Sequence, residues 1–387
     1  MLARSSRAAL AIIATLSLHA SACGSDSDPA VADASTEGAD DASAEGVEAA
    51  KAFLADYLEP ASDFPLIDSP LTKSPGKKTV GFVVCPDPSC VDLAKFLKQG
   101  TDALGWTLKT VNANDWSDPG SAIQQLIDAN VDYISLTGFP IAQYESQMAA
   151  MKAKGIPLFQ AYSTDVPEGE ANNLYSDSND ASSAEVFARV IADWVIVDSG
   201  GDAKVLNVTL GTTPILDAQV AAAKDEFEMN CPGCSFDVLT GTQNDLVTAA
   251  LPQQVVSYLQ TNPDTDYVYF AYTSLGTGVV SALKSAGLLD QVKIVGTMGG
   301  KPQFQEIIDG TSAAWTALPA EFAMWTVADQ MARFAAGEWS LELERESAIP
   351  PLYVVQTVEQ AKAVVDLPAG WAGPDGFKDA FRKLWGI

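Results

Sequence analysis

The segment Thr79-Val-Gly-Phe-Val-Val-Cys-Pro-Asp-Pro-Ser-Cys90 gives the clearest indication of how this chain folds. Its first six residues form a β-rich apolar run that is typical of a buried strand. The run ends at Cys85, because Pro86 and Pro88 cannot donate to a strand ladder. An amphipathic pattern over residues 91–104 then predicts a helix. Asp87 and Ser89 are therefore expected on a loop at the carboxyl end of a strand, where ligands bind in open parallel sheets.

The same strand–loop–helix unit continues along the chain in two successive runs. The predicted strands are residues 79–84, 106–111, 131–136, 156–161 and 173–178 in the first run, and 203–210, 235–239, 267–271, 292–296, 313–318 and 352–357 in the second. Helical patterns separate most of them. This alternation predicts an α/β fold with two doubly wound parallel-sheet lobes that have helices on both faces.

The composition argues against several classes of function. The chain has 387 residues and a formal charge of −27, which argues against nucleic-acid binding, because that affinity comes from lysine and arginine. Its single histidine, His19, lies in an apparent targeting segment, so the mature chain would lack the commonest general base and metal ligand. No pair of carboxylates stands out as catalytic. We expect no enzymatic activity, no cofactor and no metal site.

Residues 1–22 predict a lipoprotein signal peptide. Arg4 and Arg7 precede an apolar stretch that is too short to cross a membrane as a helix of about 20 residues. The small residues before Cys23 resemble a bacterial lipobox, in which cleavage leaves the cysteine as the lipid-bearing N-terminus. An ordinary signal peptide is the alternative. The acidic and proline-rich residues 23–77 predict a tether with a short helix at 48–58.

The other four cysteines form two close pairs, Cys85 with Cys90 and Cys231 with Cys234. In an exported protein such pairs indicate disulfides. The sequence Cys231-Pro-Gly-Cys234 also fits a redox motif or half of a zinc site. However, no second Cys-x-x-Cys motif and no histidine accompany it, and no helix is expected to begin there. We therefore predict two structural disulfides.

Over about residues 78–357 the chain resembles type 1 periplasmic solute-binding proteins of the ribose- and galactose-binding kind. The segments that carry the resemblance are Thr79–Val84, Ala103-Leu-Gly-Trp106, Ala122-Ile-Gln-Gln-Leu-Ile127, Val131-Asp-Tyr-Ile134, Gly155-Ile-Pro157, Ser176-Asp177, Val292-Lys-Ile-Val-Gly296 and Ala317-Leu-Pro319. The resemblance implies two lobes that are joined by three crossovers, near residues 178–180, 317–318 and 342–350, and that close around a ligand.

The same resemblance implies a division of the chain and a function. Lobe 1 would contain residues 78–179 and 318–345, lobe 2 residues 180–317 and 346–362, and a C-terminal tail residues 363–387. The implied protein is an extracytoplasmic monomer that captures a small molecule and passes it to an ABC permease. It would touch the cell membrane only through its lipid anchor. The alternative is a sensor of the same fold that signals to a membrane receptor or kinase.

The ligand site implied by the resemblance departs from that of sugar-binding relatives. Their Asp-Arg pair after the fourth strand is replaced by Tyr162-Ser163, and only Gln219 stands near the position of a second arginine. Aromatic and apolar side chains thus replace charged groups that bind sugar hydroxyls. This favours a less polar ligand, aromatic or alicyclic, over an ordinary sugar. The predicted ligand-binding residues are Asp87, Thr137, Phe139, Tyr162, Ser163, Asp177, Tyr272, Thr273 and Met298.

For some of these residues a structural role is the alternative. Asp87 could cap a turn, and Phe139 could belong to the core. Asp177 could brace the first crossover rather than contact a ligand.

Overall fold

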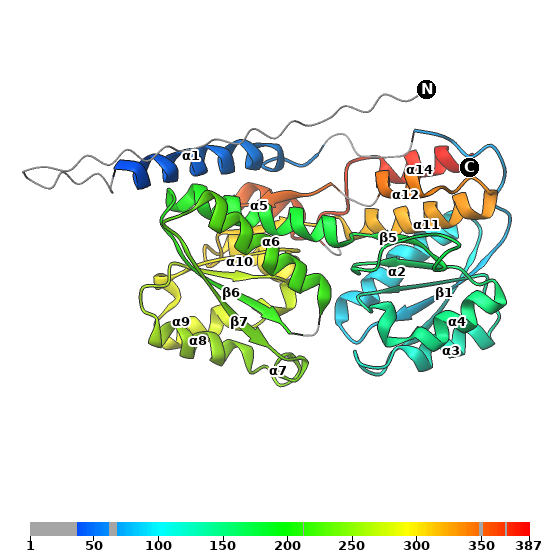
Figure 1. Cartoon of the computed structure of the whole chain (residues 1–387), viewed down its shortest axis with the longest axis horizontal. Coiled ribbons are helices and arrows are strands. Elements are labelled where there is room, and N and C mark those ends of the chain that lie inside the picture. The colour runs from blue at the N-terminus through cyan, green and yellow to red at the C-terminus, as the bar shows by residue number, and fades with distance from the viewer. Residues whose placement is uncertain (1–36, 62–67, 212, 348–350, 368–369) are drawn as a thin grey trace, which may run out of the picture.

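The computed structural model describes residues 37–61, 68–211, 213–347, 351–367 and 370–387, and it shows two α/β lobes that lie side by side (Figure 1). Each lobe contains one sheet with helices on both faces, as the alternation of strands and helices predicts. The predicted signal peptide and Cys23 lie outside the described residues. Among the helices of the described ranges, none is long and apolar enough to span a bilayer.

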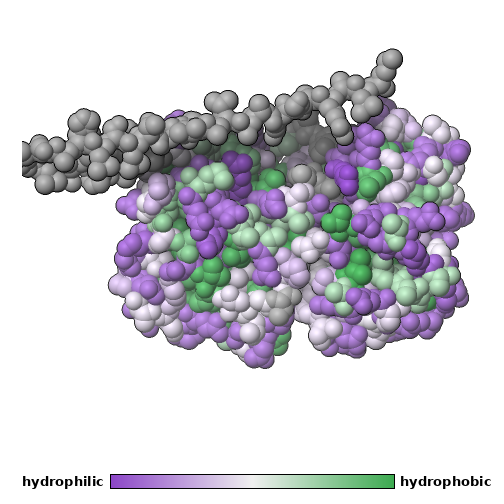
Figure 2. All heavy atoms as spheres, viewed as in Figure 1, coloured by the Kyte–Doolittle hydropathy of each residue, from purple (hydrophilic) through white to green (hydrophobic). Residues whose placement is uncertain are grey.

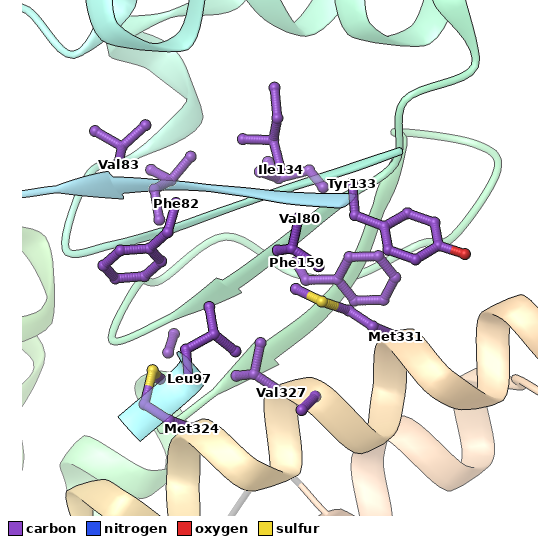
Figure 3. Close-up of a cluster of buried hydrophobic side chains, with 14 of the residues drawn as sticks. Val80, Phe82, Val83, Leu97, Tyr133, Ile134, Phe159, Met324, Val327 and Met331 are labelled. Carbon is purple, nitrogen blue, oxygen red and sulfur yellow. The ribbon is translucent and has the colours of Figure 1, made fainter. Parts of the chain in front are cut away.

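Lobe 1 contains a five-stranded parallel sheet in the order β2-β1-β3-β4-β5. Residues 80–84 of β1 are buried, because helices cover both faces of this apolar strand. Figure 3 shows Val80 and Phe82 on the side of α11, facing Val327 and Met331. The elements are β1 (Thr79–Val84), α2 (Pro88–Ala103), β2 (Thr107–Asn112), α3 (Gly120–Asp128), β3 (Tyr133–Thr137), η2 (Ile141–Gln143), α4 (Glu145–Lys154), β4 (Leu158–Ala161), β5 (Leu174–Ser178), α11 (Ala320–Ala336), α12 (Leu341–Ser347) and α14 (Phe377–Trp385).

Lobe 2 contains a six-stranded sheet in the order β11-β10-β9-β8-β6-β7. Its strands are parallel except β11, which pairs with β10 in the antiparallel direction. The prediction of two parallel-sheet lobes is confirmed, and the antiparallel direction of this edge strand is a detail that the sequence did not predict. The elements are α5 (Ala181–Ser199), β6 (Lys204–Leu210), α6 (Pro214–Asn230), β7 (Ser235–Gly241), α7 (Gln243–Val247), α8 (Leu251–Thr261), β8 (Tyr267–Phe270), η3 (Thr273–Gly276), α9 (Val279–Ala286), η4 (Leu289–Gln291), β9 (Lys293–Gly296), α10 (Lys301–Ile308), β10 (Ala314–Ala317), β11 (Tyr353–Val355) and α13 (Val358–Val364).

The three predicted crossovers between the lobes are confirmed. The first joins β5 to α5, and the second joins β10 to α11. The third leads from α12, which packs on β5 of lobe 1, to β11 of lobe 2. Residues 348–350 of this third connection lie outside the described ranges.

The N-terminal segment differs from the predicted tether. Helix α1 (Glu37–Leu54) is followed by η1 (Ala55–Tyr57), and α1 packs on α5 and α6 of lobe 2. Gly46, Ala50 and Leu54 are buried, so the contact face is a stripe at helical spacing. Two of these three buried residues are glycine and alanine, which add little apolar character to the sequence. The segment therefore resembles a disordered tether in composition, although it forms a packed helix.

The segment before β1 and the C-terminal tail both pack on the lobes. Leu71 N donates to Leu384 O at 2.7 Å, and Trp106 Nε1 donates to Gly76 O at 2.7 Å. Helix α14 packs on α11, where the indoles of Trp325 and Trp385 stack with centroids 5.5 Å apart. Residues 68–78, predicted as tether, and α14 are therefore parts of lobe 1.

Candidate functional site

A cavity of about 470 Å³ lies between the lobes, at the carboxyl ends of the strands of both sheets. The notch between the lobes is visible at the lower edge of Figure 2. Residues that follow strands of each lobe line the cavity, among them Asp87 after β1, Tyr162 after β4, Tyr272 after β8 and Met298 after β9. This is the place where open α/β sheets bind ligands.

The first loop of lobe 1 forms one rigid wall. Asp87 caps α2, because its Oδ1 accepts a hydrogen bond from Ser89 N at 2.9 Å. The predicted disulfide between Cys85 and Cys90 is confirmed and closes the same loop, with the two Cα atoms 5.5 Å apart. Cys90 Sγ lies 3.5 Å from Thr137 Oγ1, which connects this loop to the end of β3. All of these residues line the cavity.

Two hydrogen bonds cross directly between the lobes beside the cavity. Asp87 Oδ2 accepts from Ser274 Oγ at 3.1 Å, and Ser89 Oγ lies 3.0 Å from Tyr272 Oη. Burial and the nearby charge of Asp87 raise the pKa of Tyr272 above its usual value, so its phenol remains protonated at neutral pH. The structure therefore has its lobes in contact at this loop.

The cavity walls are mainly apolar. They include the side chains of Phe96, Trp116, Phe187, Leu216, Leu246 and Leu318, together with Tyr162, Tyr272 and Met298. The charged side chains among the described lining residues are Asp87, Asp92 and Lys301. Such a lining suits an organic molecule with a large apolar part.

Three lining residues other than glycine have a left-handed backbone. Their φ angles are +60° for Tyr162, +61° for Asn179 and +58° for Met298. Asparagine tolerates this conformation, but it costs a tyrosine or methionine about 1–2 kcal/mol. Backbone strain of this kind collects at functional sites, where the surrounding structure holds a side chain in place.

Six of the nine predicted ligand-binding residues line the cavity, namely Asp87, Thr137, Tyr162, Tyr272, Thr273 and Met298. The other three do not. Phe139 is fully buried and packs on Trp116, with ring centroids 5.2 Å apart. Ser163 Oγ donates to Asp165 Oδ2 at 2.9 Å.

Asp177 is the third predicted residue outside the cavity lining. Its Oδ1 accepts from Ser163 N at 3.3 Å, and its own N–H donates to Glu344 Oε1 at 3.0 Å. Asp177 therefore joins the first crossover to α12. This position agrees with its alternative role as a brace, as the burial of Phe139 agrees with a core role.

The predicted set omits several polar residues that line the cavity, and Gln219 and Asn179 are two of the most deeply buried among them. Gln219 of α6 is 2% exposed, and its Oε1 accepts a hydrogen bond from Thr297 Oγ1 at 3.0 Å. Asn179 follows β5 directly and is 1% exposed. Its place at the carboxyl end of a strand was the signal that could have identified it.

The second predicted disulfide, between Cys231 and Cys234, is also confirmed and lies in the turn between α6 and β7. Neither cysteine is among the residues that line the cavity. In the described part of the chain, no cluster of three or more His, Cys, Asp or Glu residues could hold a metal ion.

Comparison with known proteins places these features in a family. The model of a family described as periplasmic binding protein domain matches residues 85–338. No curated protein matches the chain.

Several solved structures share the fold. The 5-methylthioribose transporter solute-binding protein of Thermotoga lettingae, in complex with 5-methylthioribose, is 17% identical, with a TM-score of 0.63 over 82% of this chain and 99% of that one. An ABC transporter solute-binding protein of Mycobacterium smegmatis with bound glycerol is 20% identical, with a TM-score of 0.62 over 77% and 100%. The arabinose-transporter binding protein of a Shewanella species, bound to L-arabinofuranose, is 17% identical, with a TM-score of 0.61 over 74% and 93%.

Proposed function

Because this chain belongs to the periplasmic binding protein domain family, we propose that it is an extracytoplasmic lipoprotein that captures a small molecule between its lobes for an ABC importer. The observation that carries this proposal is the cavity of about 470 Å³ at the carboxyl ends of both sheets. A cavity of this size suits a small organic ligand. The protein binds its solute without chemical change.

We further propose that the solute is less polar than an ordinary sugar. The walls formed by Trp116, Tyr162, Phe187 and Met298 favour an aromatic or alicyclic body, or a sugar with an apolar substituent. Asp87, Thr137, Tyr162, Tyr272, Thr273 and Met298 are the proposed contacts from the predicted set. Lobe closure would bring the contacts of lobe 2 onto a molecule already held by lobe 1.

The proposed anchor is lipid on Cys23. Residues 24–36 separate this cysteine from the first residue of α1, Glu37. Fully extended, these residues span about 45 Å. The lobes would thus stay within reach of a permease in the same membrane.

The proposal is tested by identifying what the protein binds. The chain from Gly24 onward, purified without its lipid, is analysed by native mass spectrometry and then denatured to release any bound compound. We expect one solute per chain, with a ring or chain that is largely apolar. An unmodified pentose or hexose at full occupancy would show that the proposed solute class is wrong.

A thermal-shift panel extends the test to protein that is purified empty. The panel contains sugars, polyols, aromatic compounds and amino acids. A ligand at 100 times its Kd should add about 2.7 kcal/mol to the free energy of unfolding. The absence of any shift across the panel would contradict small-molecule capture of these classes.

A further inference from the structure

Asn179 is a buried polar residue with no hydrogen-bond partner for its side chain. Among the residues that the structure describes, neither its Oδ1 nor its Nδ2 forms a hydrogen bond, although the residue is only 1% exposed. A buried amide without partners costs about 1–3 kcal/mol. Most buried polar groups in native proteins are hydrogen-bonded, so this exception requires an explanation. Asn179 lines the cavity, which is where a partner could be supplied.

The surrounding backbone fixes the position of this amide. Asn179 stands between the last residue of β5 and Asp180, which caps α5 by accepting from Ser183 N at 3.1 Å. On the other side, Tyr162 N donates to Ser178 O at 2.9 Å. The left-handed φ angle of +61° is therefore held between two ordered connections.

Tyr162 is the neighbour of Asn179 in the cavity wall. Burial raises the pKa of the Tyr162 phenol, and the nearby Asn179 amide lowers it in part. The two groups are close, but they do not meet the geometry of a hydrogen bond. Together they form a polar edge beside the apolar side chains of the cavity wall.

The other left-handed asparagines of the described chain use their amides within the protein. Asn173 has a φ angle of +63° and donates from Nδ2 to Ile156 O at 2.9 Å. Asn130 has a φ angle of +49° and donates from Nδ2 to Asp128 O at 3.2 Å. The left-handed backbone therefore does not itself leave an amide without a partner. Asn179 differs from these two asparagines in that it lines the cavity, whereas Asn207 of β6, whose amide is also without a partner among the described residues, lies away from it.

We propose that Asn179 is a specificity-determining residue that binds a hydroxyl or carboxamide group of the solute. This inference rests on the proposed function, since it requires a solute in the cavity. An asparagine amide offers an acceptor and a donor side by side, which match a group that can both donate and accept. A carboxylate on the solute would leave Oδ1 without a donor, and of the three charged side chains among the described lining residues, Asp87 and Asp92 would repel it and only Lys301 would attract it. The solute class is thus a neutral molecule with an apolar body and a hydroxyl or amide head.

The first arm of the test measures thermal unfolding of the protein without added solute. Asn179→Gly is compared with Asn173→Gly, a control with nearly the same φ angle, which glycine adopts freely. Asn173→Gly loses the bond to Ile156 O, so its Tm should fall about 3 °C further than that of Asn179→Gly. An equal or larger fall for Asn179→Gly would show that Asn179 has a structural role and would overturn the inference.

The second arm measures binding by calorimetry with defined probes. The probes are benzyl alcohol, benzamide, toluene, 5-methylthioribose and L-arabinose. For each hydroxyl or amide probe that binds the wild-type protein, Asn179→Gly should raise Kd about 10-fold or more, whereas binding of toluene should not change. Asn179→Asp should also weaken the binding of benzamide and benzyl alcohol. Unchanged Kd values for these probes in Asn179→Gly would overturn the inference.

The two arms distinguish failure of the inference from failure of the proposed function. If no probe binds the wild-type protein, the result counts against the proposed solute class. The comparison of Asn179→Gly with Asn173→Gly then still decides whether the Asn179 amide stabilises the fold.

Discussion

Glu344 is a buried carboxyl at the junction of the lobes. It is 3% exposed, and its Oε1 accepts the backbone N–H of Asp177 at 3.0 Å. Burial is the main cause that raises the pKa of Glu344, and the charge of Asp180 adds to it. The bond from Asp177 and the charge of Arg345 oppose the rise, and together these effects give a pKa of about 7. Burial also holds the pKa of Asp177 well above its usual range. The first and third crossovers therefore meet at two carboxyl groups, those of Asp177 and Glu344, which bind protons more tightly in the folded chain than in the unfolded chain.

The raised pKa of Glu344 predicts a pH dependence of stability. Because the folded state holds this proton more tightly than the unfolded state, the stabilisation is complete below about pH 4.5 and is lost as the pH rises through about 7. The loss amounts to about 3 kcal/mol. Glu344→Gln keeps the acceptor for Asp177 N but cannot titrate, so its stability relative to wild type should increase over this range.

Urea unfolding between pH 4 and pH 8 checks this prediction. Glu342→Gln is the control, because Glu342 is exposed on the same helix. Its stability relative to wild type should stay constant. If the difference between Glu344→Gln and wild type were also constant with pH, the raised pKa of Glu344 would be wrong.

At the scale of single residues, the sequence predicts side chains that stand directly after a strand. Tyr162 and Tyr272 were identified in this way, and both line the cavity. Asp177 and Asn179 show the limit of the approach. Asp177 lies within β5, whereas Asn179 follows its last residue and has a left-handed backbone, so the alternation of side chains along the strand does not extend to Asn179. The sequence alone does not show where β5 ends or where its backbone becomes left-handed.

Among the elements, α1 provides a test of how the N-terminal segment packs. Gly46 is buried against α6, and a Cβ atom at this position would overlap Asn230 O. In a free helix, alanine is more favourable than glycine by about 1 kcal/mol. In a free helix, Gly46→Ala would therefore stabilise α1. Because α1 is packed against α6, we expect the added methyl group to displace the helix instead.

Hydrogen exchange of the α1 amides distinguishes these outcomes. We expect faster exchange throughout α1 in Gly46→Ala than in wild type. Ala49→Gly is the control, because Ala49 is exposed and this change affects helix propensity alone. Slower exchange in Gly46→Ala would mean that α1 is not held against α6.

The sequence predicts the presence of a helix or strand better than it predicts the direction of a strand or the packing of a helix. The buried strands were predicted because β-branched and aromatic residues are concentrated in them, as in β1 and β8. The direction of β11 was not predicted, since alternation of side chains is the same for parallel and antiparallel strands. The docking of α1 was not predicted, because alanine and glycine at helical spacing give little apolar signal.

For the whole molecule, the contacts between the lobes determine whether the cavity is open or closed. The loop that bears Asp87 and Ser89 is held by the disulfide between Cys85 and Cys90. It forms two hydrogen bonds with lobe 2, one to Ser274 of η3 and one to Tyr272, which directly precedes η3. These bonds do not require a solute. They should therefore favour the closed arrangement of the unliganded protein by about 1 kcal/mol each.

Removal of both bonds should shift the protein toward the open arrangement. The double variant Tyr272→Phe/Ser274→Ala keeps the aromatic ring and the backbone, and it should change the ratio of open to closed molecules by about 30-fold. Small-angle X-ray scattering of the unliganded protein should then give a larger radius of gyration than for wild type. The matched control is Tyr258→Phe/Ser285→Ala, whose hydroxyls bind Asp237 Oδ2 and Ser281 O within lobe 2. If both double variants scatter like the wild-type protein, the hinge connections rather than the bonds across the cleft set the lobe arrangement.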